Sequence, residues 1–291
     1  MTTIPGLLKH AVNQCGYSIL LAGRWRFPFL INFILWLVFT AQPLCAQSPY
    51  RLSWSREGLL AGSGVVASIA GLTLVNQVKA LTPGEISQID AGTVNAFDRG
   101  ATKNYSARND QARTVIALGC IASPALFLTG KAPRHDGWVI GMMYAEALMF
   151  SASLPYIAKG CFRRTRPFVY NPAAPMQEKL KADAAQSFFS LHATMAFSSA
   201  VFLSTVYSAY YPSSKWRPVV WGGSMLAAGA VGYLSYSSGA HFPTDILAGA
   251  VVGSAIGFLV PWLHRSTKKQ DFSLLPVYSG QSSCIAFLYH F

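Results

Sequence analysis

Three short polar clusters lie between the long apolar stretches of this 291-residue chain. They cover residues 159–167 (KGCFRRTRP), 190–194 (SLHAT) and 241–245 (HFPTD). Their lysine and arginine side chains suit the negative charge of a phosphoryl group, and two histidines and a carboxylate suit nucleophilic and acid/base work. The combination predicts an enzyme that cleaves phosphate esters.

The basic residues of the first cluster predict a phosphate-binding pair. Lys159 and Arg166 would bind the non-bridging oxygens, and Pro167 favours an extended backbone at Arg166. The alternative is that both side chains reach from a helix end to the membrane surface. We expect Arg163 and Arg164 to contact lipid head groups.

The other two clusters fall where apolar helices are expected to begin. Ser190 would bond a phosphate oxygen with its hydroxyl, and Leu191 would offer a backbone N–H at a helix start, where anions bind. The alternative for Ser190 is a helix N-cap. His241 and Asp245 lie four positions apart, on one helix face, which lets the carboxylate orient the imidazole. The alternative for this pair is an interfacial histidine beside a helix-terminal charge.

The order Lys-x6-Arg-Pro, Ser-x-His and His-x3-Asp resembles the type 2 phosphatidic acid phosphatase family, the membrane branch of the vanadium-haloperoxidase-like phosphatases. The resemblance covers about residues 113–263. It implies that His241 is the nucleophile, forming a phosphohistidine, and that Asp245 orients it. It also implies that His192 protonates the leaving oxygen and later activates water. We expect neither a cofactor nor a metal ion.

Two positions depart from the family pattern. Leu191 stands where the family usually has glycine, and Ser235 stands where it usually has arginine, six residues before the nucleophile. Loss of one charged donor typically costs about 10²–10³ in rate. Another basic residue would have to replace it, with candidates Arg163, Arg164 and the 80–112 segment. The alternative function is a catalytically weak protein that binds or transports lipid phosphates.

The composition indicates a membrane protein. Hydrophobic residues make up 52% of the chain and charged ones 12%, about half the usual share of about 25%. The net charge of +12 suits anionic lipid head groups. Nucleic acid is a poor partner, because the basic residues lie in short loops without an aromatic platform. The expected partners are membrane lipids and a lipid phosphate substrate.

Apolar stretches predict an all-α, polytopic bundle with five or six spans. The first stretch follows a basic region and ends in small residues, which predicts a signal peptide over 1–46, with an uncleaved anchor as the alternative. The stretches fall at about 27–46, 58–78, 113–130, 137–158, 187–209, 217–236 and 243–263.

Lysine and arginine in the short loops predict the orientation. The loops 131–137 and 211–218 and the segment after 263 are basic, so we expect them in the cytoplasm. All three polar clusters then face the periplasm of a bacterial inner membrane. A cleaved signal peptide would leave the mature N-terminus in the periplasm, where the span at 113–130 must also begin. The segment 58–78, which is rich in small residues, would then not cross the membrane.

Four segments follow from these patterns. They are the signal peptide, an extracytoplasmic or interfacial segment over 47–112, a catalytic core over 113–265 and a tail over 266–291. We expect an amphipathic interfacial helix within 80–112, with a substrate lid as the alternative. The tail predicts a small hairpin of 274–278 with 285–291, or an irregular end. Candidate substrates are lipid A phosphates, undecaprenyl pyrophosphate, phosphatidylglycerol phosphate and phosphatidate.

Overall fold

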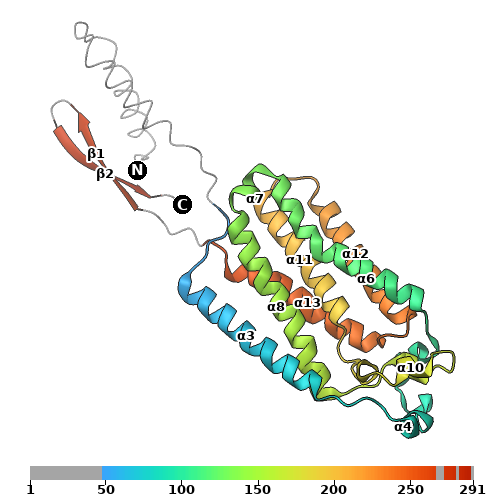
Figure 1. Cartoon of the computed structure of the whole chain (residues 1–291). Helices are drawn as coiled ribbons and strands as arrows, with labels where there is room; N and C mark the ends of the chain where they lie inside the picture. The colour runs from blue at the N-terminus through green and yellow to red at the C-terminus, as the bar shows by residue number, and fades with distance from the viewer. Residues whose placement is uncertain (1–47, 267–271, 280–281, 290–291) are drawn as a thin grey trace, which may run out of the picture. The chain divides into compact units, whose positions relative to one another are not determined.

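The computed structural model describes residues 48–266, 272–279 and 282–289, so the predicted signal peptide lies outside the described residues. The described chain is mainly helical, and its long helices form one bundle, which confirms the predicted fold class (Figure 1). The long helices are α3 (Trp54–Asn76), α6 (Ala107–Ala122), α8 (Gly137–Phe162), α11 (Leu191–Tyr210), α12 (Arg217–Ser237) and α13 (Pro243–Leu263).

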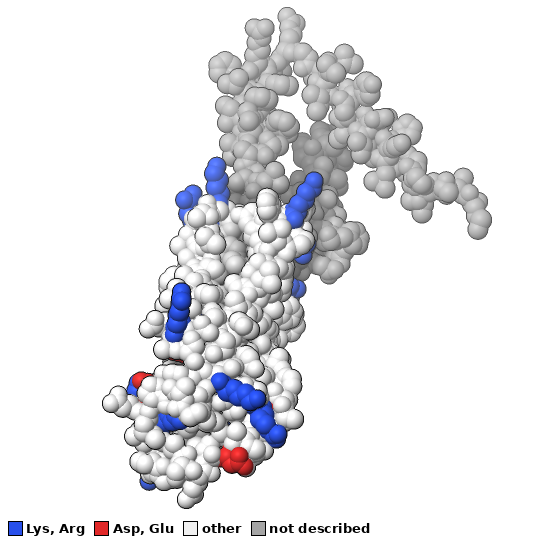
Figure 2. Space-filling view, turned by 90° about the vertical axis from the view of Figure 1, so that its right-hand side faces the viewer, with Lys and Arg blue, Asp and Glu red and all other residues white. Residues whose placement is uncertain are grey.

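Each apolar stretch predicted after the first coincides with one of these helices. Four are long and apolar enough to cross a membrane: α3, α6 with its continuation η3 (Ser123–Thr129), α8 and α13. The central helix α11 is rich in serine, threonine and alanine and contacts α6, α8, α12 and α13. Because its neighbours cover it, α11 needs little apolar surface toward lipid. On the face shown in Figure 2, most charged side chains lie toward the two ends of the bundle.

Glycine spacing explains why α13 lies so close to α11. Gly249, Gly253 and Gly257 share one face of α13, and a side chain at any of them would collide with α11. Small residues at four-residue spacing let two helix backbones approach. This packing places the start of α13, with Asp245, beside the start of α11, with His192.

Helix α3 runs parallel to α8. Gly71 lies against the backbone of Ser153, and Gly160 of α8 lies against Leu74, so residue numbers rise together along both helices. The small residues of α3 form this contact, while its other face exposes large apolar side chains. The structure differs here from the expectation that 58–78 does not cross, because α3 is long and apolar enough to span a membrane and lies parallel to α8.

The segment before α6 does not form the predicted amphipathic helix. The side chains of Thr82, Asp90 and Asn95 each cap a new short helical turn, so no continuous helix forms across them. The cap at Thr82 with Pro83 after it is the one that the sequence predicts. The turns are α4 (Pro83–Ser87), η1 (Ala91–Thr93), α5 (Ala96–Arg99) and η2 (Gly100–Lys103).

Short elements complete the chain. In the tail, β1 (Phe272–Ser279) pairs antiparallel with β2 (Ser282–Tyr289), as the predicted hairpin requires. The other short helices are α7 (Lys131–His135), α9 (Pro167–Tyr170), α10 (Met176–Lys179) and η4 (Ala182–Ala185).

Candidate active site

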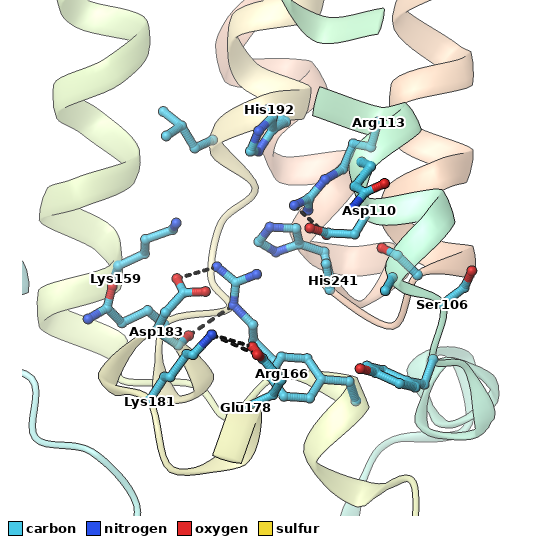
Figure 3. Close-up of a pocket in the computed structure, with 18 of the residues that line it drawn as sticks. Ser106, Asp110, Arg113, Lys159, Arg166, Glu178, Lys181, Asp183, His192 and His241 are labelled. Carbon is cyan, nitrogen blue, oxygen red and sulfur yellow. Dashed lines mark hydrogen bonds and ion pairs between the residues drawn. The ribbon is translucent and has the colours of Figure 1, made fainter. Parts of the chain in front are cut away.

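A cavity of about 430 Å³ lies at one end of the bundle (Figure 3). The end of α8 and the segment after it, the start of α11, and the turn between α12 and α13 all contribute to its wall. The structure therefore brings five of the predicted site residues to one cavity: Lys159, Arg166, Leu191, His192 and His241.

The turn between α12 and α13 holds His241 in the wall. Gly239 has φ +74°, and a side chain there would collide with the backbone of Asn104. The Gly239 carbonyl accepts from the N–H of Phe168 at 2.8 Å, and the His241 N–H donates to the Ser235 carbonyl at 3.2 Å. These backbone bonds fix the turn at both sides of the histidine.

The imidazole of His241 is buried and neutral. Its Nδ1 lies 2.8 Å from the Ser187 carbonyl oxygen, which can only accept, so Nδ1 carries the proton and Nε2 the free lone pair. Burial lowers the pKa of His241 to about 3, although Asp245 acts to raise it, and the nearby charge of Arg166 lowers the pKa further. An unprotonated Nε2 is the form that can attack phosphorus.

Asp245 holds the turn rather than the imidazole. Its Oδ2 is 3.8 Å from Nδ1 of His241, beyond hydrogen-bond distance. The carboxylate instead accepts from the Phe242 N–H at 3.0 Å, from the Ser187 hydroxyl and from Arg164. In this structure the predicted orienting role therefore belongs to the Ser187 carbonyl, and Asp245 contributes by positioning the segments around it.

Arg164 differs from its predicted contact with lipid head groups. One guanidinium nitrogen bonds Asp245, and the other lies 2.7 Å from Oδ2 of the buried Asp98. The guanidinium carbon lies 4.1 Å from the centre of the Phe242 ring. Arg164 is therefore committed to two carboxylates beneath the turn, and it does not line the cavity.

Ser190 serves as the N-cap of α11. Its hydroxyl accepts from the Ala193 N–H at 3.4 Å, and its own N–H donates to the Asp245 carbonyl at 3.1 Å. Ser190 is fully buried and does not line the cavity, unlike Leu191 and His192 after it. The N-cap alternative describes its contacts in this structure.

Arg166 faces a carboxylate inside the cavity. Its Nε donates to the Asp183 carbonyl at 2.9 Å, and Nη2 donates to the Asp183 carboxylate. The backbone of Arg166 is extended before Pro167, as predicted. Burial acts to raise the pKa of Asp183, but the charges of Arg166 and Lys159 outweigh it, so the pKa falls below its usual value. Lys159 is buried and forms no ion pair within the described residues.

Arg113 of α6 also enters the cavity, and sequence reasoning missed it. It is 4% exposed and projects toward His192 and His241 (Figure 3). Nη2 lies 2.6 Å from Asp110, but Nε and Nη1 are buried and have no hydrogen-bond partner in the described part of the chain. The available signal was an arginine at the very start of the apolar stretch 113–130, where a charged side chain is costly unless it has a function.

Ser235 leaves the usual arginine position without a charge. Its buried hydroxyl donates to the Val231 carbonyl of its own helix at 2.7 Å. Helix α12, which carries Ser235, packs against α6, which carries Arg113. A guanidinium therefore reaches the cavity from the neighbouring helix.

Residues 140–269 match the family model described as the PAP2 superfamily. The chain carries a PAP2 superfamily domain. The resemblance predicted from the three clusters is thereby confirmed, since the match contains all of them. Arg113 lies before the matched region, so the family pattern does not reveal it.

One solved structure is similar in fold. It is the crystal structure of the first transmembrane PAP2 type phosphatidylglycerolphosphate phosphatase from Bacillus subtilis, with 21% sequence identity and a TM-score of 0.42. The similarity covers 69% of this chain and 94% of that one. No curated protein matches this chain.

Proposed function

We propose that this PAP2 protein is a lipid phosphatase that hydrolyses a phosphate monoester or a pyrophosphate of a membrane lipid without a metal ion. The supporting observation is one cavity lined by two histidines, two lysines and two arginines at the end of membrane-length helices. A phosphoryl group needs this combination of a nucleophile, a proton donor and several cations.

The first step is attack by Nε2 of His241 on phosphorus. A nitrogen–phosphorus bond forms and the bond to the leaving oxygen breaks. His192 must enter this step protonated: it takes up a proton together with the anionic phosphate and gives that proton to the leaving oxygen. His192 then takes a proton from water, whose oxygen attacks the phosphohistidine and releases phosphate. His241 regains its lone pair, so both histidines return to their starting state.

Arg113 takes the place of the family arginine that Ser235 lacks. Its two unpartnered nitrogens are hydrogen-bond donors in a buried wall, where they stabilise charge more strongly than in water. Lys159 and Arg166 bind the remaining phosphoryl oxygens. This third cation favours an enzyme over a protein that only binds lipid phosphates.

The position of the cavity supports a lipid substrate in a bacterial inner membrane. A lipid keeps its phosphate at the membrane surface, where helix ends lie, and the basic loops at the opposite end favour a periplasmic cavity. Lipid A phosphates, undecaprenyl pyrophosphate, phosphatidylglycerol phosphate and phosphatidate all fit this description.

The test is phosphate release by the full chain in detergent, with EDTA present and each lipid phosphate supplied separately. We expect release from at least one lipid and none from His241→Asn, whose amide can still donate to the Ser187 carbonyl. In a quench during the first turnover, the wild type should carry acid-labile, base-stable phosphate. Binding without release on every lipid would overturn the enzyme proposal.

A further inference from the structure

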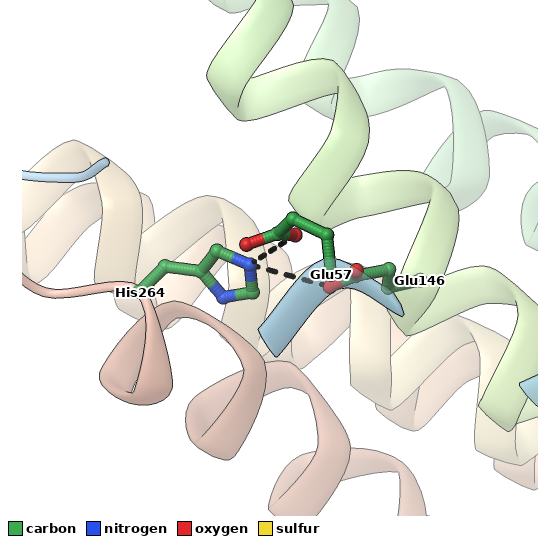
Figure 4. Close-up of side chains that lie close together, drawn as sticks. All are labelled: Glu57, Glu146 and His264. Atoms are coloured by element: carbon green, nitrogen blue, oxygen red, sulfur yellow. Dashed lines mark hydrogen bonds and ion pairs between the residues drawn. The ribbon is translucent and has the colours of Figure 1, made fainter. Parts of the chain in front are cut away.

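A second cluster of polar side chains lies near the start of α3 and the end of α13, away from the active-site cavity. Figure 4 shows its three members. Glu57 of α3, Glu146 of α8 and His264, which ends α13, bring their ligand atoms within 4.8 Å of one another. Nε2 of His264 lies 3.0 Å from Oε2 of Glu57 and 3.4 Å from Oε2 of Glu146. Three helices therefore converge on one point.

The ring of His264 is oriented for coordination. Its Nδ1 lies 2.8 Å from the Val260 carbonyl oxygen and donates to it, which directs Nε2 at the two carboxylates. A backbone carbonyl on the other ring nitrogen is the usual support of a metal-binding histidine. His264 is fully buried, which excludes water as its ordinary partner.

Glu146 has no hydrogen-bond donor among the described residues. It is 2% exposed, both of its carboxylate oxygens are buried, and the nearest basic group is His264 at 3.4 Å. Glu57 differs, because its Oε1 accepts from Nε of Arg56 at 3.1 Å and leaves Oε2 directed at His264. A buried carboxylate without a partner is unfavourable unless it takes up a proton or binds a cation, and the converging donors of Glu57 and His264 favour a cation.

We propose that Glu57, Glu146 and His264 bind a divalent transition-metal ion such as Zn²⁺. One imidazole nitrogen and two carboxylate oxygens form a donor set that this ion accepts. With bonds of about 2.0–2.2 Å, two ligands of a tetrahedral ion lie roughly 3.3–3.5 Å apart. The separations of 3.0 and 3.4 Å from His264 are close to this geometry.

The ion would join α3, α8 and α13 and takes no part in the phosphatase reaction. Sequence analysis gave no metal site here, because residues 57, 146 and 264 are far apart in the chain and match no metal-binding spacing. The site depends on the parallel packing of α3 on α8 and on the return of α13 to the same end.

The test uses full-length protein in detergent, stripped with EDTA, dialysed and titrated with Zn²⁺ by calorimetry. We expect one ion per chain and an unfolding temperature that rises with the Zn²⁺ concentration. Glu146→Gln should weaken binding at least about tenfold. The exposed Glu85 and His135 provide matched controls, since Glu85→Gln and His135→Ala should bind as the wild type does.

Glu146→Gln also distinguishes the ion from a shared proton, because its amide resembles a protonated carboxyl group. If a proton occupies the cluster, this variant should be at least as stable as the wild type in EDTA, and Zn²⁺ should change neither protein. That result would overturn the proposal. Unchanged Zn²⁺ binding in Glu146→Gln would overturn it as well, because the ion would then lie elsewhere.

Discussion

Nδ1 of His241 lies 2.8 Å from the backbone carbonyl oxygen of Ser187. The segment that enters α11 thus selects the histidine tautomer, and no side chain is required for it. Ser187 also donates its hydroxyl to Asp245, so the same residue supports both the ring and the turn. Substitutions at the histidine and at the aspartate should therefore have different effects.

His241→Asn should abolish phosphate release and leave the unfolding temperature close to that of the wild type, because the amide keeps the bond to Ser187. Asp245→Asn should lower both, since it breaks a buried ion pair with Arg164, at a cost of about 3 kcal/mol. Activity and thermal unfolding of both variants check this. Equal stability of the two variants would contradict the role of Asp245 in the turn.

The lowered pKa of His241 predicts a pH dependence of stability. The unfolded chain protonates this histidine near its ordinary pKa of 6.5, and the folded protein does so only near 3. The folded state binds fewer protons, so stability is complete above about pH 6.5 and declines as the pH falls toward 3.

Comparison with His241→Asn isolates this contribution from the other histidines. Between neutral and mildly acidic pH, the unfolding temperature of the wild type should fall more than that of the variant. Parallel curves would show that His241 titrates alike in the folded and unfolded chains.

Arg113→Ala should lower kcat/KM by about 10²–10³, as expected for one charged donor at the transition state. Its unfolding temperature should stay the same or rise, because two of its nitrogens have no partner to lose. Arg108→Ala is the matched control, an exposed arginine near the start of the same helix. A threefold or smaller change for Arg113→Ala would remove Arg113 from the phosphate site.

The helices and the cavity differ in how far the sequence could predict them. Lys159, His192 and His241 follow from motif spacing, because helix ends bring such clusters together. Arg113 and Asp183 carry no motif, and their place depends on how α6 and the loop before α11 pack. Arg164 shows the same limit: its two carboxylate partners lie 66 and 81 residues away.

The interfacial helix expected in 80–112 fails for a local reason. Residues 82, 90 and 95 can each cap a helix. A pattern of apolar and polar residues does not show at how many of these caps the chain will begin a new short helix. The small residues of 58–78 indicate close packing, but only the structure shows that their partner is α8 and that the two helices run parallel.

The Asp183 carboxylate pairs with the Arg166 guanidinium at the position where a phosphoryl group should bind. Asp183→Asn removes the competing charge and should therefore lower the inhibition constant of inorganic phosphate by about three- to tenfold. The inhibition constant is measured from the competition between inorganic phosphate and the preferred lipid substrate. Glu178→Gln is the control, because that exposed carboxylate of the same cavity pairs with Lys181 instead. Weaker inhibition in Asp183→Asn would mean that the carboxylate positions Arg166 for substrate.

Because α3 packs parallel to α8, the membrane side on which the active site lies determines the side on which Ser48 lies. Ser48 begins the described chain at the end of α13, where the Ser266 N–H donates to the Pro49 carbonyl at 2.9 Å. This end is opposite the active site, since α13 starts at Pro243, two residues after His241, and spans about 30 Å. A periplasmic active site therefore places Ser48 in the cytoplasm.

If the active site is periplasmic, a periplasmic signal peptidase therefore cannot remove residues 1–46. Given the proposed orientation, the purified protein should retain its full-length mass of 31.5 kDa. A cysteine introduced at Ala173, in the exposed loop after α9, should react with a membrane-impermeant maleimide in intact spheroplasts, in a variant with its native cysteines replaced. Loss of about 46 residues, or labelling only after lysis, would place the active site in the cytoplasm.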